Sequence, residues 1–191
     1  LDALVTPSEL KKLTSEELNS LACEIRQEII TGLAKTGGHL ASNLGVVEIT
    51  IAMHKVFNSP EDLFLWDVGH QAYVHKMLTG RRDQFDTLRQ FKGLSGFINP
   101  LESEHDAFVA GHSSTSISLA VGMALAKSHL KQSGKVVAVI GDGGLTGGMA
   151  LEAINHLGHI QKDVIIILND NEMSISENVG GLTKYMKRIK E

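Results

Sequence analysis

Residues Val136–Ser176 read VVAVIGDGGLTGGMALEAINHLGHIQKDVIIILNDNEMSIS, and this stretch decides the fold. Val136–Ile140 is a short apolar run rich in β-branched residues, which indicates a strand buried on both faces of a parallel sheet. A helix is expected from Thr146, with apolar side chains at helical spacing and Gly158 as its C-cap. Val164–Leu168 is a second strand-like run, so the stretch predicts a right-handed βαβ unit.

Polar residues follow both of these strands, at the edge where parallel α/β sheets bind ligands. Gly141-Asp142-Gly143-Gly144 follows the first strand, and Asn169-Asp170-Asn171 follows the second. Glycines beside a helix start favour phosphate, but the carboxylate of Asp142 repels phosphate unless a divalent cation lies between them. Magnesium takes oxygen ligands of this kind. We therefore expect a Mg²⁺ site made by Asp142, Asn171 and a backbone carbonyl near Met173, completed by diphosphate oxygens and water.

The glycine loop matches neither of two common phosphate-binding motifs. It is not a P-loop, because no Gly-Lys-Ser/Thr follows, and it is not a dinucleotide fingerprint, because Thr146 stands where that pattern needs glycine. A tight turn without a ligand would explain Gly141-Asp142-Gly143 alone. The second polar cluster, at the end of the next strand, makes ligand binding the more specific interpretation.

The rest of the chain fits one α/β domain with a mostly parallel sheet and helices on both faces. Thr14-x-x-Glu17 is a capping box that starts an amphipathic helix. Strands are expected at Leu63–Trp66 and Ala107–Ala110, and a buried helix at Ser116–Leu130. Polar loops would then end four parallel strands and meet at one edge.

Composition excludes several classes of protein. The chain has 191 residues and a formal net charge of −4, with no basic surface for nucleic acid. Because the chain has only one cysteine, Cys23, an internal disulfide is excluded. Cys23 is expected on the apolar side of a helix, in the protein core. No apolar run is long enough for a membrane span, and the N-terminus has no signal-peptide pattern, so a cytoplasmic location is expected by default.

Several segments resemble a known family of enzymes. GDG followed by Asn171 is similar to the metal motif of thiamine diphosphate enzymes. Four segments narrow the resemblance to the 1-deoxy-D-xylulose-5-phosphate synthases, and they cover nearly the whole chain in order: GGHLASNLGVVEIT (Gly37–Thr50), WDVGHQAYVHKMLTGRRD (Trp66–Asp83), GHSSTSIS (Gly111–Ser118) and LNDNEMSISENVG (Leu168–Gly180). Transketolase shares the plan, although its versions of these segments differ.

The resemblance implies an activity and its cofactors. It implies a thiamine diphosphate-binding fold and a Mg²⁺-dependent transferase that condenses pyruvate with D-glyceraldehyde 3-phosphate to 1-deoxy-D-xylulose 5-phosphate and CO₂. The sugar phosphate product is a precursor for isoprenoids, thiamine and pyridoxal. The family is usually homodimeric and about three times longer. Residues 1–191 are therefore expected to form its N-terminal diphosphate-binding domain, with an arm at 1–13 and the start of a truncated linker at 180–191. The pyrimidine-binding and C-terminal domains, with the glutamate that starts catalysis, are absent, so this chain alone should not turn over.

The resemblance also implies roles for individual residues. His39 and His70 are the candidates for proton transfer or oxyanion stabilisation. Cofactor contacts are expected from these residues: His70, Gly111, His112, Ser113, Gly143, Gly144 and Asn171. The metal ligands are expected to be Asp142, Asn171 and the Met173 carbonyl.

Some alternatives stay open. Arg81, Arg82 and Arg89 face a substrate phosphate or carboxylate, or else form a solvated basic segment. Five further histidines are expected to be structural or on the surface: His54, His75, His129, His156 and His159. The alternative functions are a transketolase-like transfer of two-carbon units and a non-catalytic module that binds Mg²⁺ and a diphosphate.

Overall fold

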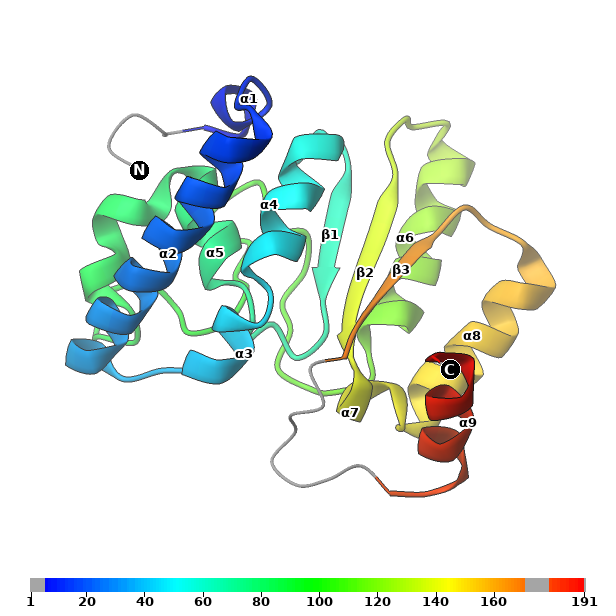
Figure 1. Cartoon of the computed structure of the whole chain (residues 1–191). Helices are drawn as coiled ribbons and strands as arrows, with labels where there is room; N and C mark the ends of the chain where they lie inside the picture. The colour runs from blue at the N-terminus through cyan, green and yellow to red at the C-terminus, as the bar shows by residue number, and fades with distance from the viewer. Residues whose placement is uncertain (1–5, 171–178, 191) are drawn as a thin grey trace.

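A computed structural model describes residues 6–170 and 179–190, and within them a parallel sheet has the strand order β1–β2–β3 (Figure 1). The elements, in chain order, are α1 (Pro7–Leu10), α2 (Ser15–Thr36), α3 (Leu40–Leu44), α4 (Val47–Val56), β1 (Leu63–Trp66), α5 (Tyr73–Lys76), η1 (Met77–Arg81), η2 (Arg82–Thr87), α6 (Ser116–Leu130), β2 (Val136–Gly141), α7 (Asp142–Leu145), α8 (Gly148–Ile160), β3 (Ile165–Asn169) and α9 (Gly181–Lys190).

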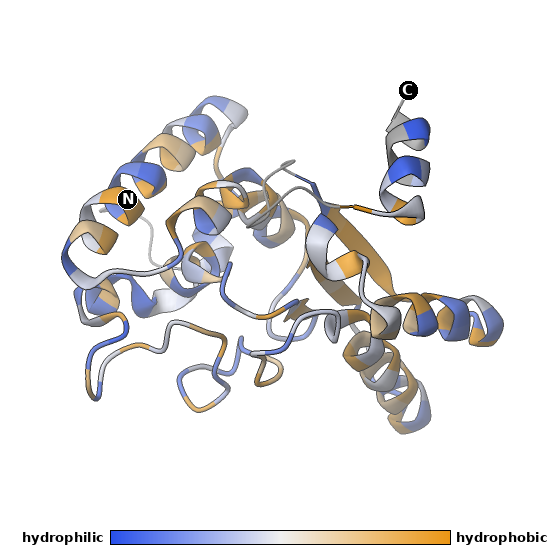
Figure 2. Cartoon of the chain, turned by 90° about the horizontal axis from the view of Figure 1, so that it is seen from below, coloured by the Kyte–Doolittle hydropathy of each residue, from blue (hydrophilic) through white to orange (hydrophobic). Residues whose placement is uncertain are grey.

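The central strand β2 is buried on both faces, as its composition predicts. Val137 and Val139 pack with Met53 of α4 on one face, whereas Ala138 and Ile140 pack with α6 and α8 on the other. Each of these four β2 side chains is fully buried. The apolar sheet therefore lies between helices with polar outer faces (Figure 2). The expected fold class, α/β with a parallel sheet and helices on both faces, is confirmed.

The long helix α2 begins where the capping box predicts. The Thr14 hydroxyl accepts a hydrogen bond from Glu17 N at 3.3 Å, and Thr14 N donates to the Glu17 carboxylate at 2.7 Å. Its buried stripe contains Leu21, Ala22, Ile25, Ile29 and Leu33. Cys23 points away from that stripe and is exposed, so the expected core position is wrong. Across residues 6–170 and 179–190, no helix combines the length and the apolar composition that crossing a membrane requires.

The connection between β2 and β3 differs in detail from the expected single helix. The short helix α7 starts directly at Asp142, and α8 starts only at Gly148. Gly158 lies inside α8, and the left-handed residue that ends the helix is Gln161, with φ of 48°. A glycine near a helix end is therefore not sufficient to locate the C-cap.

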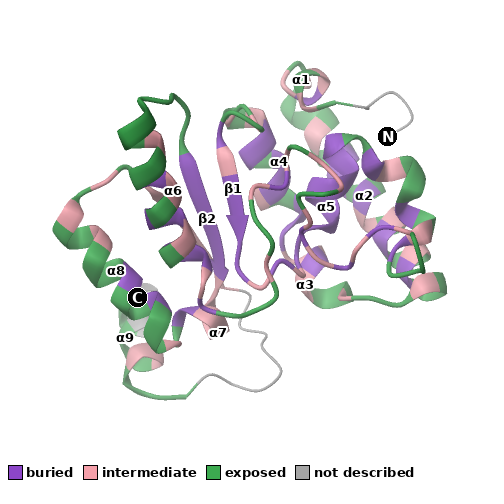
Figure 3. Cartoon of the chain, turned by 180° about the vertical axis from the view of Figure 1, so that it is seen from behind, coloured by how far each residue is buried: buried purple, intermediate pink, exposed green. Residues whose placement is uncertain are grey.

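Two further expectations about the middle of the chain are wrong. Residues 107–110 form no strand, and Val109 is 61% exposed. The helix α6 is buried on one face only (Figure 3), and Leu130 at its end is 62% exposed. The segment expected as an irregular arm, 1–13, contains α1, and Leu10 is fully buried.

Candidate functional site

The three strands end at the same edge of the sheet. Residue pairs in the register include Trp66 with Val139 and Gly141 with Asn169, so the carboxyl ends of β1, β2 and β3 are adjacent. The three strands run in the same direction and end on the same side of the sheet (Figure 1), and each leads directly into polar or glycine residues. The convergence expected from the sequence is therefore present for these three strands.

The glycine turn after β2 places Asp142 at the first position of α7, with Gly141 as N-cap in extended conformation. Asp142, Gly143 and Gly144 are half-buried, so their backbone is accessible at this edge. A Cβ on Gly144 would lie only 2.7 Å from the Asp67 carboxylate. The close packing of this turn therefore explains why position 144 carries glycine.

Two of the expected metal ligands, Asn171 and Met173, lie outside the described residues. The chain is described up to Asp170, and Asn169 at the end of β3 is buried next to Gly141. Of the expected ligands, only Asp142 is therefore placed by the structure. The complete ligand set stays a prediction.

The loop at Gly111–Ser113 reaches the same edge by a route that the sequence did not reveal. Asp67, buried at the end of β1, accepts hydrogen bonds from Ser114 N at 2.8 Å and from Ser116 N at 3.0 Å. The Ser114 hydroxyl donates to the Gly144 carbonyl at 2.7 Å, which ties this loop to the glycine turn. Gly111, His112 and Ser113 are left exposed beside it. The Asp67 carboxylate therefore holds this loop at the edge, a task that the sequence assigned to a strand at 107–110.

Asp67 is the residue of this edge that sequence reasoning missed. Its signal was weak, because an acidic residue after a strand is common and its partners are 47 and 49 residues away. Ser114 also adopts a left-handed backbone, with φ of 69°. Such a conformation is uncommon for serine and is maintained here by the hydrogen bonds on both sides of the residue.

His39 and His70 come together, as their expected roles require. Their rings are 5.2 Å apart in an edge-on arrangement, although one follows α2 and the other follows β1. Burial lowers the pKa of His39, and the charge of Arg89 lowers it further. Burial also lowers the pKa of His70, with a further lowering by His39 that Asp67 opposes. Both imidazoles are therefore neutral at neutral pH and able to accept a proton.

Tyr73 decides which nitrogen of His39 carries the proton. Its buried hydroxyl lies 3.3 Å from His39 N and 3.1 Å from His39 Nδ1. The backbone N–H can only donate, so the hydroxyl oxygen accepts there, and its own proton is available for donation to Nδ1. Burial raises the pKa of Tyr73, so the hydroxyl keeps its proton. The remaining proton of neutral His39 is then on Nε2.

The three arginines separate into different environments. Arg81 is buried and forms two hydrogen bonds with the Asp106 carboxylate, at 2.8 and 2.7 Å. Arg82 binds the Glu28 carboxylate at 2.9 Å. Neither is therefore part of a solvated basic segment, and both bind carboxylates of this chain. Arg89 is the one of the three that acts on the histidine pair, since after burial its charge is the second cause that lowers the pKa of His39.

His54 and His75 are structural, as expected. They are fully buried, and His54 Nε2 lies 2.9 Å from His75 Nδ1. His75 Nε2 lies 3.2 Å from Asp106, too poorly aligned for a full hydrogen bond. The other three, His129 on α6 and His156 and His159 on α8, are exposed.

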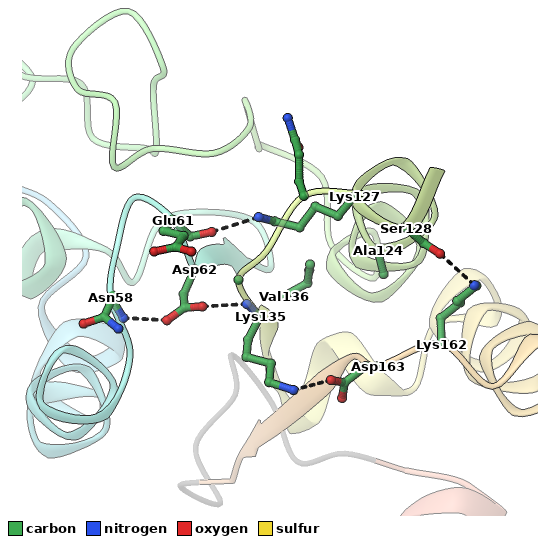
Figure 4. Close-up of a pocket in the computed structure, with 12 residues that line it drawn as sticks. Asn58, Glu61, Asp62, Ala124, Lys127, Ser128, Lys135, Val136, Lys162 and Asp163 are labelled. Atoms are coloured by element: carbon green, nitrogen blue, oxygen red, sulfur yellow. Dashed lines mark hydrogen bonds and ion pairs between the residues drawn. The ribbon is translucent and has the colours of Figure 1, made fainter. Parts of the chain in front are cut away.

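A separate cavity of about 580 Å³ opens at the opposite edge, near the amino ends of the strands (Figure 4). Its three lysines already have partners: Lys135 pairs with the Asp163 carboxylate, Lys127 donates to the Glu61 backbone carbonyl, and Lys162 donates to the Ser128 hydroxyl. Because these cations are already engaged, the carboxyl edge is the better candidate for ligand chemistry.

Comparison with known proteins first defines the class of fold. The transketolase from Leishmania mexicana has a similar structure, with a TM-score of 0.75 over 92% of this chain and 31% of that chain, at 20% identity. The chain is therefore an α/β domain with a transketolase-like fold. Residues 1–191 match the family described as 1-deoxy-D-xylulose-5-phosphate synthase, and the chain belongs to that family.

Relatives in this family are similar over nearly the whole chain. The 1-deoxy-D-xylulose-5-phosphate synthase of Alkaliphilus oremlandii is 66% identical over 95% of this chain, and that of Brevibacillus brevis is 62% identical over 100% of it. The chain spans 29% and 30% of the length of these two relatives.

Proposed function

We propose that this chain is the diphosphate- and metal-binding part of a transferase that condenses pyruvate with D-glyceraldehyde 3-phosphate to 1-deoxy-D-xylulose 5-phosphate and CO₂. The observation that carries the proposal is the convergence at one sheet edge of Asp142, the loop held by Asp67 and the paired imidazoles of His39 and His70. Metal ligand, diphosphate cradle and proton-transfer groups are the parts that this chemistry needs.

The residues of the edge fit thiamine diphosphate and Mg²⁺. The donor set consists of hard oxygens, which suits Mg²⁺ bridged to a diphosphate. A side chain at Gly144 would collide with Asp67, so the glycine turn packs directly against the carboxylate that holds the neighbouring loop. His70 Nδ1 is buried and, among the described residues, has no hydrogen-bond partner. A bound polar group would satisfy that nitrogen.

Each group has a proposed task. Asp142, Asn171 and the Met173 carbonyl hold the metal, while the N–H groups of Gly143 and Gly144 bind the diphosphate. Thiamine diphosphate supplies a nucleophilic carbon and an electron sink when it is bound.

The other candidate residues are proposed to contact the cofactor or to transfer protons. Gly111, His112 and Ser113 contact the cofactor from the exposed loop. His39 donates through Nε2–H to developing negative charge on substrate oxygen, and His70 exchanges protons beside it.

Properties of the whole protein are part of the same proposal. The chain acts together with a pyrimidine-binding domain, in a cytoplasmic homodimer, and its product feeds the synthesis of isoprenoids, thiamine and pyridoxal. The support is the family membership and the identity of 57–66% to relatives named as the synthase.

The deciding experiment measures CO₂ release from pyruvate by the full-length protein with thiamine diphosphate and Mg²⁺. Release should be fast only when D-glyceraldehyde 3-phosphate is added, and Asp142→Ala should abolish it. The matched control is Asp163→Asn, because Asp163 is an exposed carboxylate at the opposite ends of the strands.

Other outcomes identify the alternatives. Two-carbon transfer between sugar phosphates without CO₂ would indicate a transketolase-like enzyme. Calorimetry that shows ATP binding in preference to thiamine diphosphate, with no turnover, would indicate a non-catalytic Mg²⁺ and diphosphate module. Either result contradicts the synthase proposal.

A further inference from the structure

A buried amide lies between the two histidine segments. Asn43 is in α3 and is 0% exposed. Its Nδ2 donates to the His39 carbonyl at 2.7 Å and to the His70 carbonyl at 2.9 Å, and its Oδ1 accepts from Tyr73 N at 2.9 Å. With two carbonyl acceptors and one N–H donor around it, the amide has only one orientation that satisfies all three. Each of its polar atoms is thus used on these segments.

We propose that Asn43 is a positioning residue that holds His39 and His70 at their working separation. The inference rests on the proposed function, in which both imidazoles take part. His39 is four residues from Asn43, whereas His70 and Tyr73 are 27 and 30 residues away, so the relative position of the two segments depends on tertiary contacts. His39 is in addition the residue that precedes α3, and its own side chain makes no capping hydrogen bond there.

The contacts of Asn43 converge on the catalytic pair from the backbone side. The amide fixes the main chain at both histidines, and it fixes the start of α5 at Tyr73, whose hydroxyl sets the His39 tautomer. One residue therefore controls the separation of the rings and the proton position on one of them. Side chains of similar size do not satisfy the three backbone groups in the same way, because aspartate lacks the donors and leucine lacks every polar atom.

The expected consequence of losing the amide is misplacement of groups without loss of the ligand site. Asn43 contacts none of the residues proposed to hold metal or diphosphate in the described part of the chain. In the full-length enzyme, Asn43→Ala should therefore lower kcat by roughly ten- to a hundredfold, since small misplacements of catalytic groups have effects of that size. The KM for pyruvate should change little.

A matched control separates positioning from general loosening. Thr50 is also fully buried, and its hydroxyl donates to the Val46 carbonyl at 2.7 Å within the neighbouring helix α4. Thr50→Val removes a buried hydrogen bond of similar quality but contacts neither histidine. Its kcat should equal that of the parent enzyme. If Asn43→Ala does not fold, Asn43→Ser, which keeps a donor and admits water, takes its place.

A second readout is independent of turnover. NMR titration of the imidazole protons can follow His39 and His70 separately. His39 faces Arg89, Tyr73 and His70, whereas His70 faces Asp67 and His39. In the parent both should titrate below ordinary histidine. In the Asn43 variant both should move towards the ordinary value, as the rings separate and hydrate.

The outcomes are distinguishable. A fall in kcat together with shifted titrations in the Asn43 variant, but not in Thr50→Val, supports the proposal. Unchanged kcat and titrations in the Asn43 variant would overturn it, as would equal effects of Thr50→Val. A parent that never decarboxylates pyruvate, but whose histidine titrations still shift in the Asn43 variant, would show that the positioning role holds while the proposed function fails.

Discussion

Replacing Arg81 by methionine would leave the Asp106 carboxylate buried without its closest cation. Asp106 is 3% exposed, and Arg81 binds both of its oxygens. Burial alone would raise the pKa of Asp106, but the adjacent His75 and the two hydrogen bonds from the charged Arg81 guanidinium lower it far below its ordinary value. The carboxylate therefore remains ionised, and it must be compensated.

The structure allows the size of the effect to be worked out. Removing one partner of a buried ion pair costs about 3–5 kcal/mol. Asn99 N still donates to Asp106 at 2.9 Å, so the lower end, about 3 kcal/mol, is expected for Arg81→Met. With a urea m-value of about 2 kcal/mol per molar, the unfolding midpoint should fall by roughly 1.5 M.

The control is the neighbouring residue in sequence. Arg82 pairs with Glu28, but their side chains are 29% and 25% exposed, so Arg82→Met should cost less than about 1 kcal/mol. Urea unfolding can be followed by the fluorescence of Trp66, the only tryptophan of the chain, which is 3% exposed and lies 5.8 Å from the His75 ring. Both variants need the same measurement at the same pH.

The pH dependence gives a second, internal check. The Arg81 charge lowers the pKa of His75, although burial is the larger cause. Without Arg81, the carboxylate of Asp106 favours a proton on His75, so the loss of stability should be smaller at pH 6 than at pH 8. Equal losses for Arg81→Met and Arg82→Met, at either pH, would refute the reasoning.

Other predictions concern the glycine turn, the tyrosine and the buried histidines. An alanine at Gly147 would place its Cβ 2.1 Å from the Ser114 hydroxyl, so it should destabilise the protein by about 1–3 kcal/mol in thermal unfolding. Alanine at Gly148, where a Cβ would meet open space, should not destabilise it, and equal melting temperatures of the two variants would contradict this prediction. Tyr73→Phe should mix the tautomers of His39, visible in ¹H–¹⁵N spectra of the imidazole, and unchanged spectra would argue against the assigned proton position. Burial lowers the pKa of His75 in the folded protein. As the pH falls, His75 therefore binds a proton in the unfolded chain before it does so in the folded protein. The free energy of unfolding should then decrease by up to about 1.4 kcal/mol per pH unit for that histidine as pH falls below roughly 6.5, and a flat profile between pH 7.5 and 5.5 would speak against neutral burial.

Local patterns predicted most of the secondary structure that places the site. The capping box at Thr14 and the β-branched runs of β2 and β3 act through neighbours in sequence, so the sequence alone was sufficient for them. The expected strand at 107–110 failed because a strand needs a partner edge, and the sequence does not show which edges are available. Cys23 was misplaced because its position lies just beside the buried stripe of α2.

The site itself could be predicted only in its chemistry. Asp142, His39 and His70 were identified by motif and resemblance, and the structure places them at or beside the expected edge. Asp67 and Asn43 could not be found in this way. Their importance lies in hydrogen bonds to backbone groups more than 25 residues away, and a backbone partner leaves no mark in the sequence.

The strand β3 has a consequence for handling this chain. It is the outer strand next to β2, and Ile165–Leu168 is only half-buried. Within the described residues, no strand pairs with the outer side of β3, and four consecutive large aliphatic residues without a charge on such a strand are a template for strand addition between molecules. In concentrated samples of this chain alone, self-association should therefore begin at β3.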